Sequence, residues 1–179
     1  MAGSKNEGGF RAVPDERLRC LMHSLCVSLG NIHRITGSDM IKVRLRERFS
    51  KEVTLTPPMV AEYAAAAGDD NPLHHDPEFS AATRFGRPIA SGTHTTALLL
   101  GLTASHFSKK GGAVGLEFCV QLRRPIYADE KILLEWLVVK ITPNAKMKGD
   151  IVELRGRIKG QDGSTAIGAK GRILLTDQL

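Results

Sequence analysis

Cysteine and aromatic residues are both scarce in this sequence of 179 residues, of which aromatics make up 5%. The three cysteines, Cys20, Cys26 and Cys119, are odd in number and irregularly spaced. They form neither a disulfide framework nor a Cys/His zinc pattern, which favours a reducing compartment, the cytoplasm. A structural zinc site and a disulfide-stapled secreted fold are therefore not expected.

Long hydrophobic runs are also missing. No apolar run reaches the roughly 18 residues that a membrane-spanning helix needs, so no membrane association is expected. The net charge of +6 indicates anionic partners. Nucleic acid is disfavoured, because no RNA-binding or helix-turn-helix pattern is present and few aromatic side chains are available for base stacking. A phosphate-bearing small molecule and an acidic carrier protein fit the charge equally well.

The chain divides into two parts by composition. Residues 1–39 read as an N-terminal extension, disordered or peripheral, and residues 40–179 as one domain. Met1–Gly9 is small, polar and glycine-rich, and an apolar stretch begins near Arg17. Acidic residues beside that stretch argue against a targeting signal.

An α+β fold is predicted for the domain. Pro57-Pro58 should end a first strand, and Gly68 should end an alanine-rich helix. Ser91 is a good N-cap for a long helix that is apolar nearly all round and should therefore be buried. Four strand-like segments follow, and a curved antiparallel sheet wrapped around the long helix is the expected arrangement. The predicted elements are strand Val43–Val53, helix Met59–Ala67, a helical turn Ser80–Arg84, helix Ser91–Phe107, and strands Ala113–Arg123, Lys131–Ile141, Ile151–Lys159 and Ser164–Leu175.

Two polar segments carry the most specific information. Ala67–Phe79 contains Gly-Asp-Asp-Asn-Pro-Leu-His-His-Asp, and Thr83–Gly92 contains Arg-Phe-Gly-Arg-Pro-Ile before the glycine of the long helix. Together these segments resemble the hydratase motif of MaoC-like, (R)-specific enoyl-CoA hydratases, which have a hot-dog fold. Arg124–Asp129 is similar to a second pattern of that family. The resemblance runs from Val43 to about Thr176.

The resemblance implies reversible hydration of trans-2-enoyl thioesters to (R)-3-hydroxyacyl thioesters. Asp69 and His74 would be the acid–base pair, since a carboxylate and an imidazole sharing one water can serve both proton transfers. The backbone N–H of Gly92 would bind the thioester oxygen. Asn71 and Ser91 would help to shape the substrate site, although many relatives have His where this chain has Ser91. No metal or redox cofactor is implied, and the substrate would be carried on coenzyme A or on acyl carrier protein.

Other interpretations stay open at this point. Asp69 could merely shape a turn, and His74 could be a structural histidine. Asp76 is expected to cap the next helical turn, and His94 to pack or to make a polar contact rather than to act in catalysis. A hot-dog acyl thioesterase and a non-catalytic acyl-binding or scaffold subunit are the alternative functions. An exposed sheet edge favours a homodimer or a dimer-based oligomer. The candidates for phosphate contacts are Arg84, Arg87, Arg123, Arg124, Lys109 and Lys110.

Overall fold

A computed structural model describes residues 43–177. The elements in chain order are β1 (Arg48–Thr54), α2 (Pro57–Ala66), the 3₁₀ turn η1 (Pro72–His74), α3 (Pro77–Ala81), α4 (Gly92–Phe107), β2 (Gly112–Leu122), β3 (Lys131–Asn144), β4 (Gly149–Lys159) and β5 (Thr165–Thr176). Within residues 43–177, no helix is long and apolar enough to cross a membrane. The predictions for residues 1–39 lie outside the described residues.

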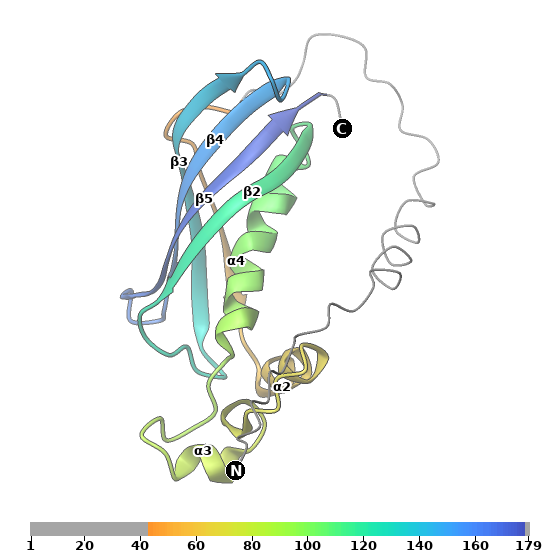
Figure 1. The fold of residues 1–179 in the computed structure, drawn as a ribbon. Coiled ribbons are helices and arrows are strands. Elements are labelled where there is room, and N and C mark those ends of the chain that lie inside the picture. Colours follow the sequence, from red (N-terminus) through yellow and green to blue (C-terminus); the bar gives the residue numbers. More distant parts are fainter. Residues whose placement is uncertain (1–42, 178–179) are drawn as a thin grey trace, which may run out of the picture. The chain divides into compact units, whose positions relative to one another are not determined.

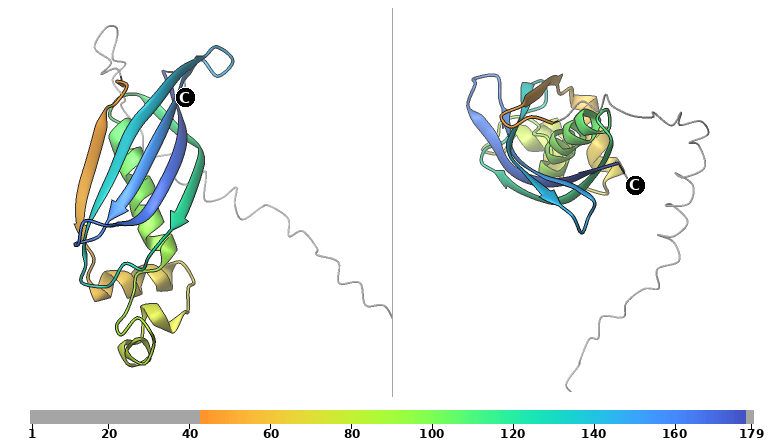
Figure 2. Two further views of the ribbon diagram at one scale, coloured as in Figure 1. Left: turned by 90° about the vertical axis from the view of Figure 1, so that its left-hand side faces the viewer. Right: turned by 90° about the horizontal axis from the view of Figure 1, so that it is seen from above.

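The five strands form one antiparallel sheet in the order β1-β3-β4-β5-β2. The sheet curves around α4, which lies along its concave side (Figures 1 and 2). The short elements α2 and α3 lie beyond one end of the sheet, beside the start of α4 (Figure 1). This arrangement is the predicted α+β hot-dog fold.

Trp136 of β3 is the largest side chain of the core and joins the sheet to the helix. It is 1% exposed, and its indole N–H donates a hydrogen bond to the carbonyl of Leu99, midway along α4, at 2.8 Å. The neighbouring strand makes room for the ring with Gly156, where a Cβ atom would stand 2.6 Å from ring carbons. Only glycine is compatible with this position, because such a contact lies far inside van der Waals distance.

Helix α4 was predicted closely in its bounds and wrongly in its burial. Ser91 is its N-cap and accepts a hydrogen bond from the backbone N–H of His94 at 3.1 Å. The buried side chains come from one face of the helix, namely His94, Thr95, Leu99, Thr103 and Phe107. Residues on other faces, among them Ala97 and Gly101, are exposed. The five strands found within residues 43–177 cover only part of the helix surface, which an apolar sequence alone cannot indicate.

The N-terminal end of the domain also differs from the prediction. Pro57 and Pro58 do not end a strand but form the first turn of α2, where their fixed φ and missing N–H groups are tolerated. Thr56 is the N-cap. Strand β1 begins at Arg48 rather than Val43, because the chain turns at Arg46, which has a positive φ of 68°. The interruption comes from this turn, and no glycine or proline marks it in the sequence.

The remaining predictions differ mainly at their ends. Asp76 is the N-cap of α3, as expected, and accepts bonds from the N–H groups of Glu78 and Phe79. The helix accordingly starts at Pro77, three residues before the predicted Ser80. Strand β3 runs on to Asn144 through Pro143, where Ile141 was predicted as its end. Its pairing with β4 continues to Asn144–Gly149, so the hairpin is longer than the turn residues suggested.

A cluster around Glu47 ties the C-terminal end of α4 to the chain before β1. The Glu47 carboxylate accepts a hydrogen bond from His106 at 2.7 Å and forms an ion pair with Lys110, while Arg44 donates its backbone N–H at 2.9 Å. The His106 ring stacks on Phe49 with centroids 3.8 Å apart. Burial would raise the pKa of Glu47, but the bonds from these partners outweigh it and lower the pKa from 4.5 to about 2.

Replacing Glu47 by Gln is expected to lower the free energy of unfolding by about 2 kcal/mol at pH 7, because a charge-assisted cluster is lost. The folded-state pKa of Glu47 lies below its unfolded value, so its contribution is fully present above pH 4.5 and disappears as the pH falls toward 2. Urea unfolding of wild type and Glu47→Gln should therefore differ at pH 7 and converge near pH 2. Glu52→Gln, which removes an exposed pair with Lys131, is the matched control and should change stability by less than about 1 kcal/mol. An equal difference at both pH values would contradict the role given to the Glu47 charge.

Candidate active site

The segment that carries Asp69 begins with a tightly defined end of α2. Ala67 is the C-cap and Gly68 follows with a φ of +71°. The N–H of Asp69 donates to the carbonyl of Ala64 at 2.8 Å, and that of Gly68 to Ala65 at 3.1 Å. These two bonds are the Schellman motif, which ends a helix and fixes the direction of the chain that leaves it. Gly68 ends the helix, as predicted, and the direction of the chain at that end determines where the Asp69 side chain lies.

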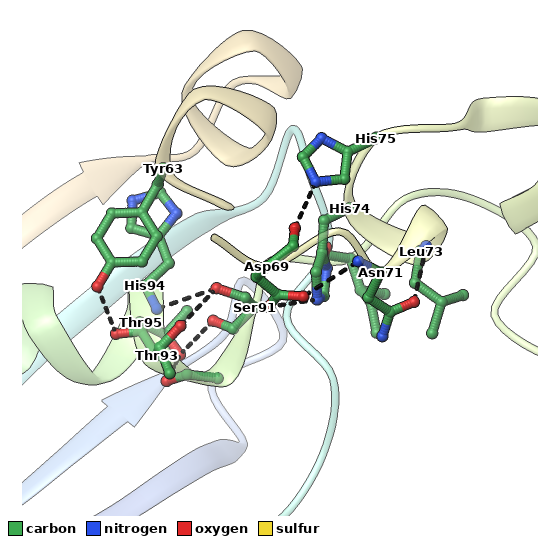
Figure 3. Close-up of polar contacts among 12 residues, drawn as sticks. Tyr63, Asp69, Asn71, Leu73, His74, His75, Ser91, Thr93, His94 and Thr95 are labelled. Atoms are coloured by element: carbon green, nitrogen blue, oxygen red, sulfur yellow. Dashed lines mark hydrogen bonds and ion pairs between the residues drawn. The ribbon is translucent and has the colours of Figure 1, made fainter. Parts of the chain in front are cut away.

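Asp69 and His74 lie side by side (Figure 3). Nε2 of His74 is 3.5 Å from Oδ2 of Asp69, which is longer than a good hydrogen bond between these groups. The His74 side chain is buried, with 8% of its surface exposed, whereas Asp69 retains 32%. The other carboxylate oxygen, Oδ1, accepts the backbone N–H of Asn71 at 3.2 Å. One oxygen of Asp69 is thus held by the loop while the other faces the imidazole.

The orientation of His74 is fixed by a backbone group from a distant segment. Its Nδ1 lies 2.7 Å from the carbonyl oxygen of Ile89, and since a carbonyl only accepts, Nδ1 carries the proton. In the neutral ring Nε2 then has a free lone pair, which points to Asp69. Ile89 is itself held by its N–H bond to the Leu73 carbonyl at 3.1 Å and by a bridge to Tyr127. Turning the ring would break its bond to Ile89, whose backbone is fixed by two other segments.

The neighbours of the pair mainly shape the loop. Asn71 is the N-cap of η1 and accepts the N–H of Leu73 at 3.1 Å, so its side-chain oxygen is occupied. His75 donates to the backbone carbonyl of Asp69 at 2.7 Å and points away from His74 (Figure 3). The sequence did not suggest this role for His75. The side-chain NH₂ of Asn71 makes no hydrogen bond within residues 43–177.

Gly92 opens α4 three residues after Ile89, so its N–H belongs to the same short segment that orients His74. No acceptor for this N–H is present among residues 43–177, as is normal for the first turn of a helix. A Cβ atom at Gly92 would stand 2.5 Å from Cδ1 of Leu122, at the end of β2. Glycine allows this close approach. Leu122 was not foreseen at the site, because its place depends on the pairing of β2 with β5.

Ser91 and His94 complete the helix start. Ser91 is 2% exposed, and its hydroxyl is engaged by the N–H of His94 and lies 3.0 Å from the Thr93 hydroxyl. The His94 ring stacks on Tyr63 at 4.3 Å, while the Tyr63 hydroxyl donates to the Thr93 carbonyl at 3.3 Å. Burial lowers the pKa of His94, which keeps the ring neutral. His94 thus packs, as expected.

The six candidates for phosphate contacts do not gather in one place. Lys110 is paired with Glu47, and Arg124 forms an ion pair with Asp162 at 2.7 Å. Arg87 lies over the Tyr127 ring at 4.4 Å, and Arg84 over Phe85 at 4.9 Å. Of this set, Arg123 lines a hollow rich in cations on the outer face of the sheet.

Comparisons with known proteins give the family. The model of the MaoC like domain matches residues 41–155. An (R)-specific enoyl-CoA hydratase of Aeromonas caviae is 32% identical over 134 residues, which are 75% of this chain and 92% of that protein. A 3-hydroxybutyryl-CoA dehydratase of Methylorubrum extorquens is 26% identical over 63% of this chain and 70% of its own length.

Solved structures agree. The (R)-hydratase from A. caviae involved in PHA biosynthesis superimposes with a TM-score of 0.69 at 26% identity, over 75% of this chain and 98% of the other. An R-hydratase from Pseudomonas aeruginosa in the unliganded form gives a TM-score of 0.64 at 22% identity, over 76% of this chain and 84% of that one, and shows the same fold.

The fold and these relatives define an enzyme of the hydratase/dehydratase class, a carbon–oxygen lyase. The chain belongs to the MaoC-like dehydratase family.

Proposed function

We propose that this enzyme adds water reversibly to trans-2-enoyl thioesters to give (R)-3-hydroxyacyl thioesters, with Asp69 and His74 as its catalytic pair. The observation that supports this most is the 3.5 Å gap between Nε2 of His74 and Oδ2 of Asp69. In the neutral form of His74 both atoms are hydrogen-bond acceptors, because the ring proton is then held on Nδ1 by the Ile89 carbonyl. A water beside both atoms could donate one hydrogen to each of them, so the pair is suited to hold a water.

A water held in this way is ready for addition to a double bond. As its oxygen bonds to the β-carbon, one of the two side chains removes a proton from it, and a proton is delivered to the α-carbon. The electrons of the double bond pass toward the thioester carbonyl, whose oxygen gains negative charge. The N–H of Gly92, at the positive end of α4, would bind that oxygen. Asn71 NH₂ and Ser91, which holds the first turn of α4, would support substrate binding.

Hydration of crotonyl-CoA by the purified protein tests the proposal. Addition of water removes the absorbance of the enoyl thioester without releasing a thiol. Loss of absorbance with no free thiol is the expected result. Release of coenzyme A with the double bond intact would establish the thioesterase alternative instead. Absence of both reactions with enoyl thioesters on coenzyme A and on acyl carrier protein would favour the non-catalytic acyl-binding alternative. The cytoplasmic location and the independence from metal and redox cofactors stay predictions.

A second copy of the chain is proposed to cover strand β2, which is one edge of the sheet. The strand has 11 residues, and its side chains Val114 and Leu116 are 40% and 38% exposed. A long apolar edge strand pairs readily with another strand, so natural proteins protect or occupy it. The apolar residues of α4 that remain exposed, such as Ala97, support an additional covering partner.

The double variant Val114→Lys/Leu116→Lys is expected to be monomeric, because two lysines on each copy would repel across the shared edge. Light scattering after size-exclusion chromatography measures the mass directly, and wild type should show twice the mass of one chain. Leu45→Lys changes a leucine that is even more exposed, at 59%, but lies outside β2, and it should leave the dimer unchanged. A dimeric double variant would refute the β2 interface.

A further inference from the structure

The outer face of the sheet, turned away from α4, carries a hollow of about 480 Å³ that is lined by cations from several strands. We call it the basic hollow. Its cations are Arg48, Arg123, Arg155, Arg157 and Lys170. One acid, Glu135, also lines it, and that carboxylate is already held by Arg157 at 2.6 Å and Lys159 at 3.2 Å. The positive charge of the hollow is therefore not neutralised from within.

The strand register places like charges directly opposite each other in this hollow. Arg155 of β4 pairs with Lys170 of β5, and Lys170 pairs with Cys119 of β2. On the other side, Arg155 is opposite Leu137, which is opposite Arg48. Like charges directly opposite on neighbouring strands destabilise a sheet. Among the residues that the structure describes, neither Arg155, Lys170 nor Arg48 has an acidic partner.

Other cations of this face are balanced, which sets the basic hollow apart. Arg172 pairs with Glu117 at 3.3 Å, and Lys140 with Glu153 at 3.6 Å. Within residues 43–177, the basic hollow thus contains a row of cations without acidic partners on a face whose other cations form ion pairs, and such a row lowers the stability of the sheet. Such losses of stability are expected where a protein binds something.

The basic hollow lies near the start of α4, where Gly92 belongs to the candidate active site. Arg123 lines it with its guanidinium group over Gly168, where a Cβ atom would stand 3.0 Å from Nη2. Arg123 directly follows Leu122, the residue whose side chain touches the place of a Cβ at Gly92. From the Leu122–Ile167 pair to the Cys119–Lys170 pair the sheet advances three residues, roughly 10 Å. A ligand at Gly92 can thus extend around the end of β2 onto the outer face.

We propose that the basic hollow binds the phosphorylated nucleotide end of coenzyme A, an inference that rests on the proposed function. The pantetheine arm would lead from the thioester at Gly92 past Arg123, and the phosphates would lie against Arg155, Lys170 and Arg48. Leu137, between Arg48 and Arg155, offers an apolar surface to the base. The volume is that of a small-molecule site, whereas a carrier protein would need a contact of about 800 Å² on each partner. These features favour coenzyme A over an acidic carrier protein.

Binding of free coenzyme A tests the inference without requiring turnover. Calorimetric titration should give a dissociation constant at least roughly tenfold higher for Arg155→Gln/Lys170→Gln than for wild type, because two charge-assisted phosphate contacts are lost. Titration with pantetheine, which has no phosphate, should give the same result for both proteins. The double variant should also melt no lower than wild type, since it removes two like charges that face each other.

The matched control is Lys51→Gln/Lys146→Gln. It removes the same two positive charges from exposed lysines that lie outside the basic hollow and have no ion pair within residues 43–177. Coenzyme A affinity should be unchanged in this control. An equal loss in both double variants would reduce the effect to overall charge and overturn the site.

The outcomes separate this inference from the proposed function. Unchanged coenzyme A affinity in Arg155→Gln/Lys170→Gln overturns the inference, whatever the enzyme does with crotonyl-CoA. Loss of affinity in a protein that does not hydrate enoyl thioesters upholds the hollow and refutes the proposed function. Unchanged coenzyme A affinity together with slower turnover of a crotonyl-acyl carrier protein would assign the hollow to an acidic protein and overturn the coenzyme A assignment.

Discussion

Hydration of crotonyl-CoA by the Asp69→Asn variant is expected to fall by about three orders of magnitude, the usual contribution of a positioned acid–base group. Asparagine has the same shape as aspartate and can still accept the Asn71 N–H through its oxygen. It presents either a donor or a neutral oxygen to His74, so the negative charge that we propose holds and polarises the water is lost. Initial rates at saturating substrate measure the effect.

Asp70→Asn is the matched control for this variant. Asp70 is the next residue, is exposed, and makes no hydrogen bond or ion pair among the described residues, so its loss should change the rate less than twofold. Thermal unfolding of Asp69→Asn should stay near wild type. A folded Asp69→Asn variant with more than a tenth of the wild-type rate would remove Asp69 from the mechanism.

His74→Gln examines the second member of the pair in the same assay. Glutamine can donate to the Ile89 carbonyl, but it supplies no basic nitrogen toward Asp69. If both side chains act on one water, the variant that lacks both should be little slower than either single variant. Losses that multiply in the double variant would indicate that the two residues act independently.

The largest expected loss of stability comes from Trp136→Ala. Removing this side chain is expected to lower the free energy of unfolding by about 3–5 kcal/mol, because it empties the centre of the core between β3 and α4. For a domain of this size the melting temperature should fall by roughly 10 °C. Leu137→Ala is the control, since Leu137 is the next residue but lies half-buried on the outer face. A change below about 1 kcal/mol in Trp136→Ala would show that the ring does not hold the helix to the sheet.

The sequence predicted those features of the fold that depend on residues close together in the chain, and missed those that depend on distant segments. Helix α4 was predicted to within one residue, because Ser91 is a strong N-cap and the helix capping bond spans three residues. The burial of α4 was mispredicted, since it is decided by how far the sheet curves. The cluster of Glu47 with His106 and Lys110 joins residues 59 and 63 positions apart, and no local pattern marks it.

In the candidate site, too, the local motif was predicted and the contributions of distant segments were not. The resemblance of Gly68–Asp76 to the hydratase motif predicted that Asp69 and His74 act as a pair, whereas the residues alone were equally compatible with a simple turn. Their relative orientation depends on the Ile89 carbonyl, a backbone group that carries no sequence signal. Leu122 reaches Gly92 only because β2 pairs with β5, a contact between segments far apart in the chain.

The strand order has a consequence for how the protein is made. Strand β2 is synthesised before β3 and β4, yet its partner within the chain is β5, which ends at Thr176. While the ribosome extends the chain through β3 and β4, β2 has its apolar side chains in place, but β5, its partner among the described strands, has not yet been made. The nascent chain is therefore exposed to misassociation until β5 has been made, and the position of Leu122 against Gly92 is set only after β5 has emerged.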